Sequence, residues 1–241
     1  MMNAIEINGL TKKYGEKTAV NRISLKVEGG TLASFLGVNG AGKTTLIKML
    51  CGLTAPDEGD ALLCGFSIRD AANEVKSRIN VSPQETAVAR NLTVRENLIM
   101  IAGIYGCSKA DAVKKADEMI EEFHLSEYSR SRASTLSGGW QRRLSIAMAL
   151  ISQPEVLFLD EPTLGLDVIA RRELWTIIEK LKGKVTVILT THYLEEAEAL
   201  SDKIYIIAHG TLRAEGTSAE ILAESGCDKF EDAFVKIASA E

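Results

Sequence analysis

Long apolar runs are missing from this sequence of 241 residues. The most apolar stretches, such as 156–159 and 204–208, are short and have polar neighbours, whereas a membrane-spanning helix needs about 18 or more apolar residues. Residues 1–7 alternate between apolar and polar side chains and lack the basic segment and apolar block with which a secretory signal begins. We therefore expect no transmembrane segment and a cytoplasmic location.

Cysteine and excess positive charge are also scarce. The four cysteines are Cys51, Cys64, Cys107 and Cys227, and their wide spacing matches neither a metal site nor a disulfide framework, so free thiols are predicted. Lys and Arg total 28 against 33 Asp and Glu, which gives a net charge of -5. Without a basic surplus, nucleic acid is not an expected partner.

Strand-like and helix-like segments alternate along the chain, which is typical of an α/β sheet covered by helices. Strands are predicted at 5–10, 23–27, 31–36, 79–82, 156–159, 185–190 and 203–208. The segments that begin at 31, 156 and 185 are almost entirely apolar and should lie centrally, buried on both faces. The earlier strands alternate and predict an antiparallel flap at one edge. Residues 90–150 favour helix, with Ser108 to Asp111 as a capping box.

A glycine-rich segment follows the strand at 31–36 and precedes a helix-prone run at 45–50. In that setting it fits the P-loop pattern, in which backbone N–H groups and a helix N-terminus surround phosphates. Lys43 should reach the terminal phosphates and Thr44 should bind Mg²⁺. The alternative is a glycine-rich turn without a ligand. The segment consists of Gly37, Val38, Asn39, Gly40, Ala41, Gly42, Lys43 and Thr44.

Two adjacent carboxylates, Asp160 and Glu161, end the apolar strand at 156–159. Ligands gather at the carboxyl ends of parallel strands, so both acids should face the same crevice as the P-loop. Asp160 suits Mg²⁺, and Glu161 is then free to act as the general base toward water. The alternative is an acidic strand end followed by a proline turn at Pro162.

A second anion-binding helix start is predicted at residues 136–141, Leu-Ser-Gly-Gly-Trp-Gln. Ser137, Gly138 and Gly139 offer a hydroxyl and bare N–H groups ahead of a helix. Taken alone, the segment could be a flexible loop with a helix cap. Together with the P-loop and the paired acids, it closely resembles the nucleotide-binding domains of ATP-binding cassette (ABC) transporters, over essentially the whole chain.

This resemblance implies a P-loop NTPase (RecA-like) core with an antiparallel β flap and an inserted α-helical subdomain at about 86–150, in one domain over 1–241. It implies that Tyr14 stacks on adenine, that Gln84 touches Mg²⁺ and the attacking water, that His192 contacts the γ-phosphate, and that Asp167 lies in a dimer-interface loop at the nucleotide. Thr45 belongs with the P-loop residues that bind ATP. Two residues depart from the family pattern: Trp140 stands for glutamine and Val168 for proline.

Residues 191–202 resemble the exporter-type branch that works with ABC-2 permeases. The resemblance therefore implies an ATPase that energises export through an ABC-2 type permease, held at the inner face of the cell membrane by it. Two cassettes, identical or different, would close on ATP between one P-loop and the other chain's Ser137. Alternatives are a soluble cassette ATPase that remodels a macromolecular partner, and another P-loop class such as a kinase or GTPase.

Overall fold

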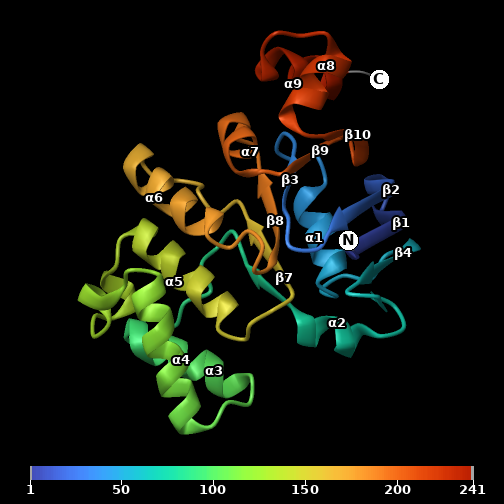
Figure 1. Ribbon diagram of the computed structural model, residues 1–241. Coiled ribbons are helices and arrows are strands. Elements are labelled where there is room, and N and C mark those ends of the chain that lie inside the picture. Colours follow the sequence, from blue (N-terminus) through green and yellow to red (C-terminus); the bar gives the residue numbers. More distant parts are fainter. Residues whose placement is uncertain (1, 240–241) are drawn as a thin grey trace.

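A six-stranded sheet forms the centre of the computed structural model, which describes residues 2–239 (Figure 1). Its strand order is β10-β9-β3-β8-β7-β6, and all neighbours are parallel except β10, which is antiparallel to β9. The strands β3, β8 and β7 are central and fully buried, as their composition predicts. The strand bounds are β3 Leu32–Leu36, β6 Ile79–Ser82, β7 Val156–Asp160, β8 Thr186–Thr191, β9 Lys203–Ala208 and β10 Thr211–Gly216.

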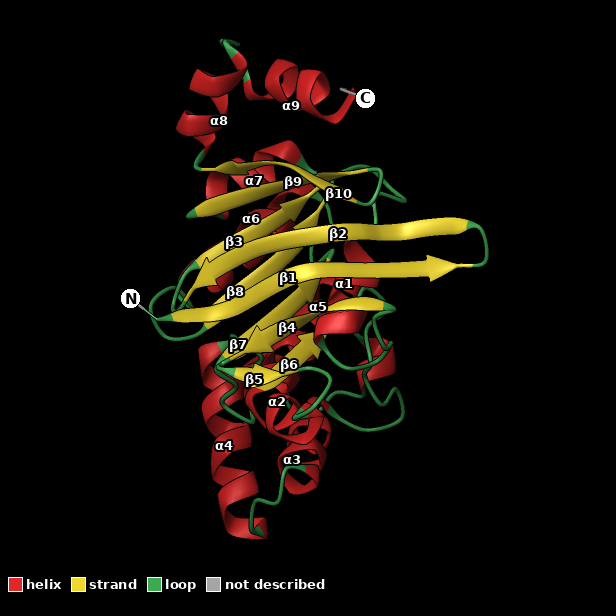
Figure 2. Cartoon of the chain, turned by 90° about the vertical axis from the view of Figure 1, so that its right-hand side faces the viewer, coloured by secondary structure: helices red, strands yellow, loops and turns green. Residues whose placement is uncertain are grey.

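A second, antiparallel sheet has the order β2-β1-β4-β5, and Figure 2 shows β1 and β2 as a long hairpin beside the central strands. The early strands are therefore antiparallel as predicted. They form a sheet of their own that meets the main sheet at one edge, where the N–H group of Asn21 donates to the carbonyl oxygen of Gly210, next to β10, at 2.7 Å. Buried side chains of α1 (Lys43–Leu50) pack against both sheets, so the hairpin covers the helix instead of extending the sheet. The bounds are β1 Asn3–Tyr14, β2 Lys17–Glu28, β4 Glu58–Leu63 and β5 Phe66–Ser67.

Helices occupy the chain between 94 and 150, where the described residues form no strand. These helices gather at one end of the molecule, away from the antiparallel sheet (Figure 1). Among residues 2–239, no helix has the length and apolar character that a membrane crossing requires. The remaining bounds are α2 Ala72–Arg78, α3 Val94–Ile104, α4 Lys109–Glu122, α5 Gly138–Leu150, α6 Val168–Glu179, α7 Leu194–Leu200, α8 Ser218–Ser225 and α9 Phe230–Ser239, with short 3₁₀ helices at Ser126–Tyr128 and Ala133–Thr135.

Alternating side chains fix the faces of the central strands. In β7, Val156 and Phe158 pack with α1 and the antiparallel sheet, whereas Leu157 and Leu159 pack with α5 and α6. Burial of a large apolar side chain contributes about 1.5–3 kcal/mol, and a slip of one residue would turn every side chain to the opposite face. The core therefore fixes the position at which β7 ends, which is Asp160.

Candidate functional site

Three parallel strands end side by side and place the predicted site residues in one row. Leu36, the last residue of β3, pairs with Thr191 of β8, and Asp160 of β7 pairs with Thr190. Gly37, Glu161 and His192 are each the next residue after their strand. Because the strands are parallel, residues far apart in the sequence emerge at the same edge of the sheet.

The P-loop turns tightly at two glycines. A Cβ atom at Gly37 would lie 2.2 Å from the carbonyl oxygen of Ile207, and one at Gly42 would lie 2.4 Å from that of Ala19. Gly42 also has a φ of 106°, a left-handed conformation that favours glycine. Only glycine fits at either position, and the turn leads directly into the N-terminus of α1 at Lys43.

A pocket of about 480 Å³ opens at this turn, a size typical of small-molecule sites. Of the predicted residues, it brings together Tyr14, seven residues of the P-loop region, Gln84, Glu161 and His192. It also contains Lys17, Ala19 and Leu164. Its lining residues are Tyr14, Lys17, Ala19, Asn39, Gly40, Ala41, Gly42, Lys43, Thr44, Thr45, Gln84, Glu161, Leu164 and His192.

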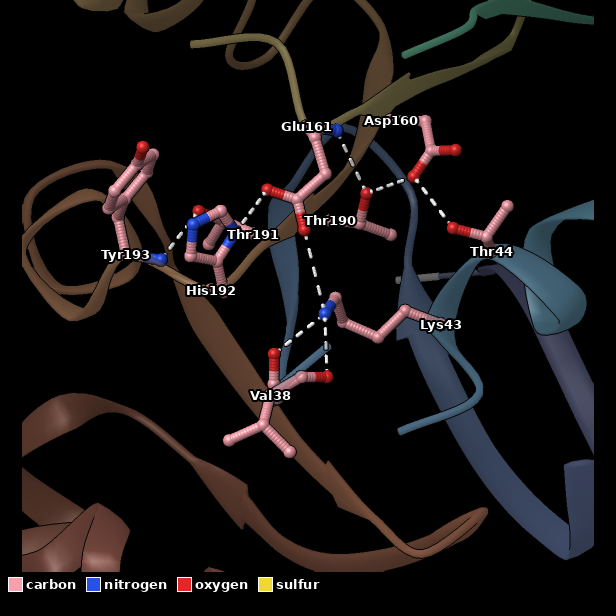
Figure 3. Close-up of polar contacts among 10 residues, drawn as sticks. Val38, Lys43, Thr44, Asp160, Glu161, Thr190, Thr191, His192 and Tyr193 are labelled. Atoms are coloured by element: carbon pink, nitrogen blue, oxygen red, sulfur yellow. Dashed lines mark hydrogen bonds and ion pairs between the residues drawn. The ribbon is translucent and has the colours of Figure 1, made fainter. Parts of the chain in front are cut away.

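Lys43 lines this pocket, and its ammonium group contacts backbone and carboxylate oxygens (Figure 3). Its Nζ donates to the carbonyl oxygens of Gly37 at 2.6 Å and Val38 at 3.3 Å and lies 3.5 Å from Oε1 of Glu161. Burial lowers the pKa of Lys43, and the charge of Glu161 opposes that effect. The lysine is thus held at the mouth of the turn by backbone oxygens and a carboxylate.

The two acids differ in their partners. Oδ1 of Asp160 accepts hydrogen bonds from the hydroxyls of Thr190 at 2.5 Å and Thr44 at 3.4 Å. Oε2 of Glu161 lies 2.8 Å from Nδ1 of His192, so Glu161 stands between this ring and Lys43 (Figure 3). One carboxylate therefore bonds to two hydroxyls, one from β8 and one from the start of α1, and the other faces two nitrogen groups in the pocket.

Glu161 has a strained backbone, with a φ of 49°. A residue other than glycine in the left-handed region costs of order 1–3 kcal/mol, and such strain concentrates at functional sites. Its N–H group is held by both the carbonyl oxygen and the hydroxyl of Thr190, at 3.1 and 3.0 Å. The turn after β7 consequently directs the Glu161 side chain into the pocket, to which Asp160 does not contribute a lining atom.

Gln84 lies just beyond β6, where Ser82 pairs with Leu159, and it lines the pocket. Its backbone is fixed from α5. The buried guanidinium group of Arg142 donates to the carbonyl oxygens of Pro83 at 2.7 Å and Gln84 at 2.6 Å. The helix that follows Ser137 is thereby bonded to the loop that carries Gln84.

The predicted second phosphate site lies elsewhere in the subunit. Ser137 is the N-cap of α5, and Gly138 lines a separate pocket that shares only Gln84 and Leu164 with the first one, among the residues that the structure describes. The carboxylate of Asp167 caps α6 and accepts from the N–H groups of Ile169 and Ala170, each at 2.9 Å. One chain therefore holds these groups apart from its own P-loop.

Lys17 and Ala19 are pocket residues that the sequence analysis did not identify. The hairpin pairs Lys17 with Tyr14, and both residues line the pocket. The sequence does contain a signal for this hairpin, because Gly15 and Glu16 form a two-residue turn between two alternating segments. Tyr14 itself is 50% exposed, as expected of an aromatic platform that is open to a ligand.

A comparison with known protein families shows the family to which this chain belongs. Residues 20–164 match the model of the family described as ABC transporter. The chain belongs to that family. It is the ATP-binding and ATP-hydrolysing subunit of an ABC transporter, as its sequence resemblance implies, and the P-loop fold class expected from the sequence is confirmed.

Proteins that are similar to this chain over almost its full length are also ATP-binding proteins. The cassette is 42% identical over 226 residues to the doxorubicin resistance ATP-binding protein DrrA of Mycobacterium tuberculosis, covering 92% of this chain and 68% of that protein. It is 43% identical over 231 residues to the Nod factor export ATP-binding protein I of Paraburkholderia xenovorans, covering 95% and 76%. Both relatives are ATP-binding proteins of export or resistance systems.

Solved structures share the fold. The structure of an ATP-binding subunit of an ABC transporter superposes with a TM-score of 0.87 at 27% identity, covering 98% of this chain and all of that one (100%). An ATP-binding cassette of an ABC transporter in its ADP conformation gives a TM-score of 0.83 at 25% identity, with 98% and 99% covered.

Proposed function

We propose that this cassette energises export by an ABC-2 type permease, through closure of two cassettes on ATP and hydrolysis of that ATP. The observation that carries the proposal is the convergence of Lys43, Glu161 and His192 on one pocket at the carboxyl edge of the sheet. The doxorubicin resistance and Nod factor export relatives support the exporter assignment. Residues 1–241 would act as one ABC ATPase domain, with a helical subdomain at about 86–150, on the cytoplasmic side of the permease.

The residues suit a nucleotide with its terminal phosphate over α1. Tyr14 would stack on the adenine ring, and the P-loop N–H groups from Gly37 to Thr45 would surround the phosphates. Lys43 would leave its carbonyl partners for the β- and γ-phosphate oxygens, where a charge-assisted hydrogen bond is stronger than a neutral one. The nucleotide thus replaces Glu161 as the counter-charge of Lys43.

The oxygen donors present fit Mg²⁺. The hydroxyl of Thr44 and the carboxylate of Asp160 lie 3.4 Å apart, and Gln84 enters the pocket from β6. Mg²⁺ prefers oxygen ligands, commonly one or two carboxylates together with phosphate oxygens and waters. When bound, the ion neutralises charge that develops on the phosphates. Thr44, Asp160 and Gln84 are the residues that we propose hold it.

Glu161 is the proposed general base. It would accept the proton of a water whose oxygen bonds to the γ-phosphorus, while the bond from that phosphorus to the β–γ bridging oxygen breaks and ADP leaves. His192 would hold the γ-phosphate from the other side of Glu161, and Gln84 would orient the water. Ser137, Gly138, Gly139 and Asp167 would act on the nucleotide of the second cassette.

Replacement of Glu161 by Gln tests this proposal. The amide keeps the shape of the side chain but cannot accept the proton, so ATP hydrolysis should fall by roughly 10²- to 10⁴-fold, while ATP and Mg²⁺ should drive the variant into a stable dimer on gel filtration. Glu195→Gln makes the same charge change at an exposed residue of α7 and should behave as wild type. A Glu161→Gln protein that stays monomeric with ATP and Mg²⁺ contradicts the closure model.

A further inference from the structure

Thr190 is a fully buried polar residue at the end of β8, opposite Asp160 in the strand register. From the sequence alone, Thr190 is only the last residue of the apolar strand predicted at 185–190. Its hydroxyl donates to Oδ1 of Asp160 at 2.5 Å and accepts from the N–H group of Glu161 at 3.0 Å. Figure 3 shows this hydroxyl between the two acidic residues.

In these two hydrogen bonds, the Thr190 hydroxyl acts once as a donor and once as an acceptor. A threonine hydroxyl has one hydrogen to donate and oxygen lone pairs that accept. Here the hydrogen is directed to the carboxylate of Asp160, and a lone pair receives the N–H of Glu161. Thr44 also bonds to Oδ1, so both hydroxyls bond to the same carboxylate oxygen of Asp160.

The same residue holds the strained turn. Glu161 has its φ of 49° immediately after Asp160, and its N–H group lies within hydrogen-bond distance of both the carbonyl oxygen and the hydroxyl of Thr190. A strained conformation persists only where its surroundings fix it. Loss of the hydroxyl would therefore remove the shorter of the two hydroxyl bonds to Asp160 and one of the two restraints on Glu161.

We propose that Thr190 is a positioning residue of the ATP site, whose hydroxyl orients Asp160 for the metal ion and holds the backbone of Glu161. The inference rests on the proposed function of Asp160 and Glu161. A purely structural role for a β-branched residue would need only its shape, which valine supplies. Valine has this shape but no hydroxyl. The substitution Thr190→Val therefore distinguishes a packing role from a positioning role.

Strand β8 supplies a matched control. Thr186 is also buried, at 3% exposure, and its hydroxyl accepts a single hydrogen bond, from the N–H of Gly30 at 3.0 Å. It lies at the opposite end of the strand from the pocket. Thr186→Val therefore removes a buried, hydrogen-bonded hydroxyl from the same strand without touching the site.

The test measures binding of a nonhydrolysable ATP analogue to the purified full-length chain, first in EDTA and then during titration with Mg²⁺. For Thr190→Val we expect metal-free affinity within about twofold of wild type and a half-saturating Mg²⁺ concentration raised roughly 10- to 100-fold, the usual effect of removing a residue that orients a metal ligand. Thr190→Ser should restore the wild-type value, and Thr186→Val should not change it.

Equal Mg²⁺ dependence in Thr190→Val and Thr186→Val would overturn this inference while leaving the proposed function intact. Wild-type protein that binds the analogue without any effect of Mg²⁺ would instead overturn the metal role of Asp160 itself, and with it this inference. If Thr190→Val does not fold, Thr190→Cys provides the same comparison against Thr190→Ser, because a thiol is a weak donor; equal half-saturation in those two variants would refute the role of the hydroxyl.

Discussion

Lys43 is the residue on which binding of the nucleotide should depend most. Its side chain is 6% exposed and its ammonium group already contacts the P-loop carbonyls, so few conformations must be lost when phosphate arrives. Charge-assisted hydrogen bonds contribute about 1.5–3 kcal/mol each. Lys43→Ala should therefore weaken ATP binding by roughly 10- to 100-fold for one such bond, measured by equilibrium titration.

Lys48 is the matched control for that substitution, because it lies one turn further along α1 and is exposed. Lys48→Ala removes the same charge from the same helix and should bind ATP as wild type does. Wild-type affinity in Lys43→Ala would remove the P-loop assignment of this residue.

Glu196 is a fully buried acid in α7. Trp175 of α6 donates its Nε1 proton to Oε1 of Glu196 at 3.0 Å, and burial raises the pKa of this carboxyl above its ordinary value of 4.5. The folded chain therefore binds the proton more tightly than the unfolded chain, so the stability of the wild type should decline as pH rises above the ordinary glutamate range.

Glu196→Gln keeps an oxygen for Trp175 but cannot ionise. Below the ordinary glutamate pKa, the pH dependence of thermal unfolding should be the same in the variant and the wild type. The variant should then gain in melting temperature relative to the wild type as pH rises above the ordinary value of 4.5. Parallel melting curves across the whole range would show that the carboxylate form costs nothing in the fold.

At the scale of elements, Arg142 joins α5 to the loop after β6. Its two hydrogen bonds to the carbonyl oxygens of Pro83 and Gln84 link these segments directly. Arg142→Met preserves length and apolar contacts but removes both donors. We expect roughly 2–4 kcal/mol of lost stability in urea unfolding, together with lower ATPase activity because Gln84 loses its support.

Arg142→Lys distinguishes the geometry from the charge, since an ammonium group lacks the planar pair of donors. It should fall between wild type and Arg142→Met in both measurements. Activity and stability of Arg142→Met equal to those of the wild type would show that α5 and the loop are not coupled by this residue.

Elements with a strong apolar pattern were predictable from sequence. The bounds of β6 and β9 are those predicted, Ile79–Ser82 and Lys203–Ala208. Strand β9 is a short apolar run that is buried between β3 and β10, whereas β6 alternates apolar and polar residues at the edge of the sheet. Ser108 caps α4 as expected, accepting from the N–H of Asp111 at 3.2 Å. However, Asp111 accepts from the Ser108 hydroxyl, a bond between side chains that leaves the predicted reciprocal box incomplete.

Elements whose burial depends on distant partners were missed. The strands β4, β5 and β10 have few fully buried residues, so their sequences show no clear period.

The roles of Thr190 and Arg142 were missed for a related reason. A hydroxyl in a strand or a guanidinium group in a helix has no local sequence signature. Its partner can be distant in the sequence, as in the bond from Arg142 to Gln84, which spans 58 residues.

At the scale of the whole molecule, the proposed ATP site is divided between two surfaces of the subunit. The P-loop pocket and the start of α5 form separate pockets that meet at Gln84 and Leu164. Two chains related by a twofold axis would bring each P-loop against the other chain's α5, since such an axis pairs one surface with another reciprocally. This arrangement predicts that damage to the two surfaces complements between chains.

Gly138 allows the arrangement to be tested without disturbing the single subunit. A Cβ atom at this position meets no atom within 4 Å in the described structure, so Gly138→Asp should fold normally. Its carboxylate would nevertheless repel a γ-phosphate that approaches the start of α5. Gly138→Asp and Lys43→Ala should each lack ATPase activity, because every site in either homodimer contains one damaged surface.

A mixture of the two variants should recover activity. In the mixed dimer, the intact P-loop of the Gly138→Asp chain meets the intact α5 start of the Lys43→Ala chain, which restores one of its two sites. With random pairing, about a quarter of the wild-type sites should reappear, measured as ATP hydrolysis against the proportion of the two chains. If each chain used its own α5, no pairing could restore a site, and activity would stay at the level of the separate variants at every ratio.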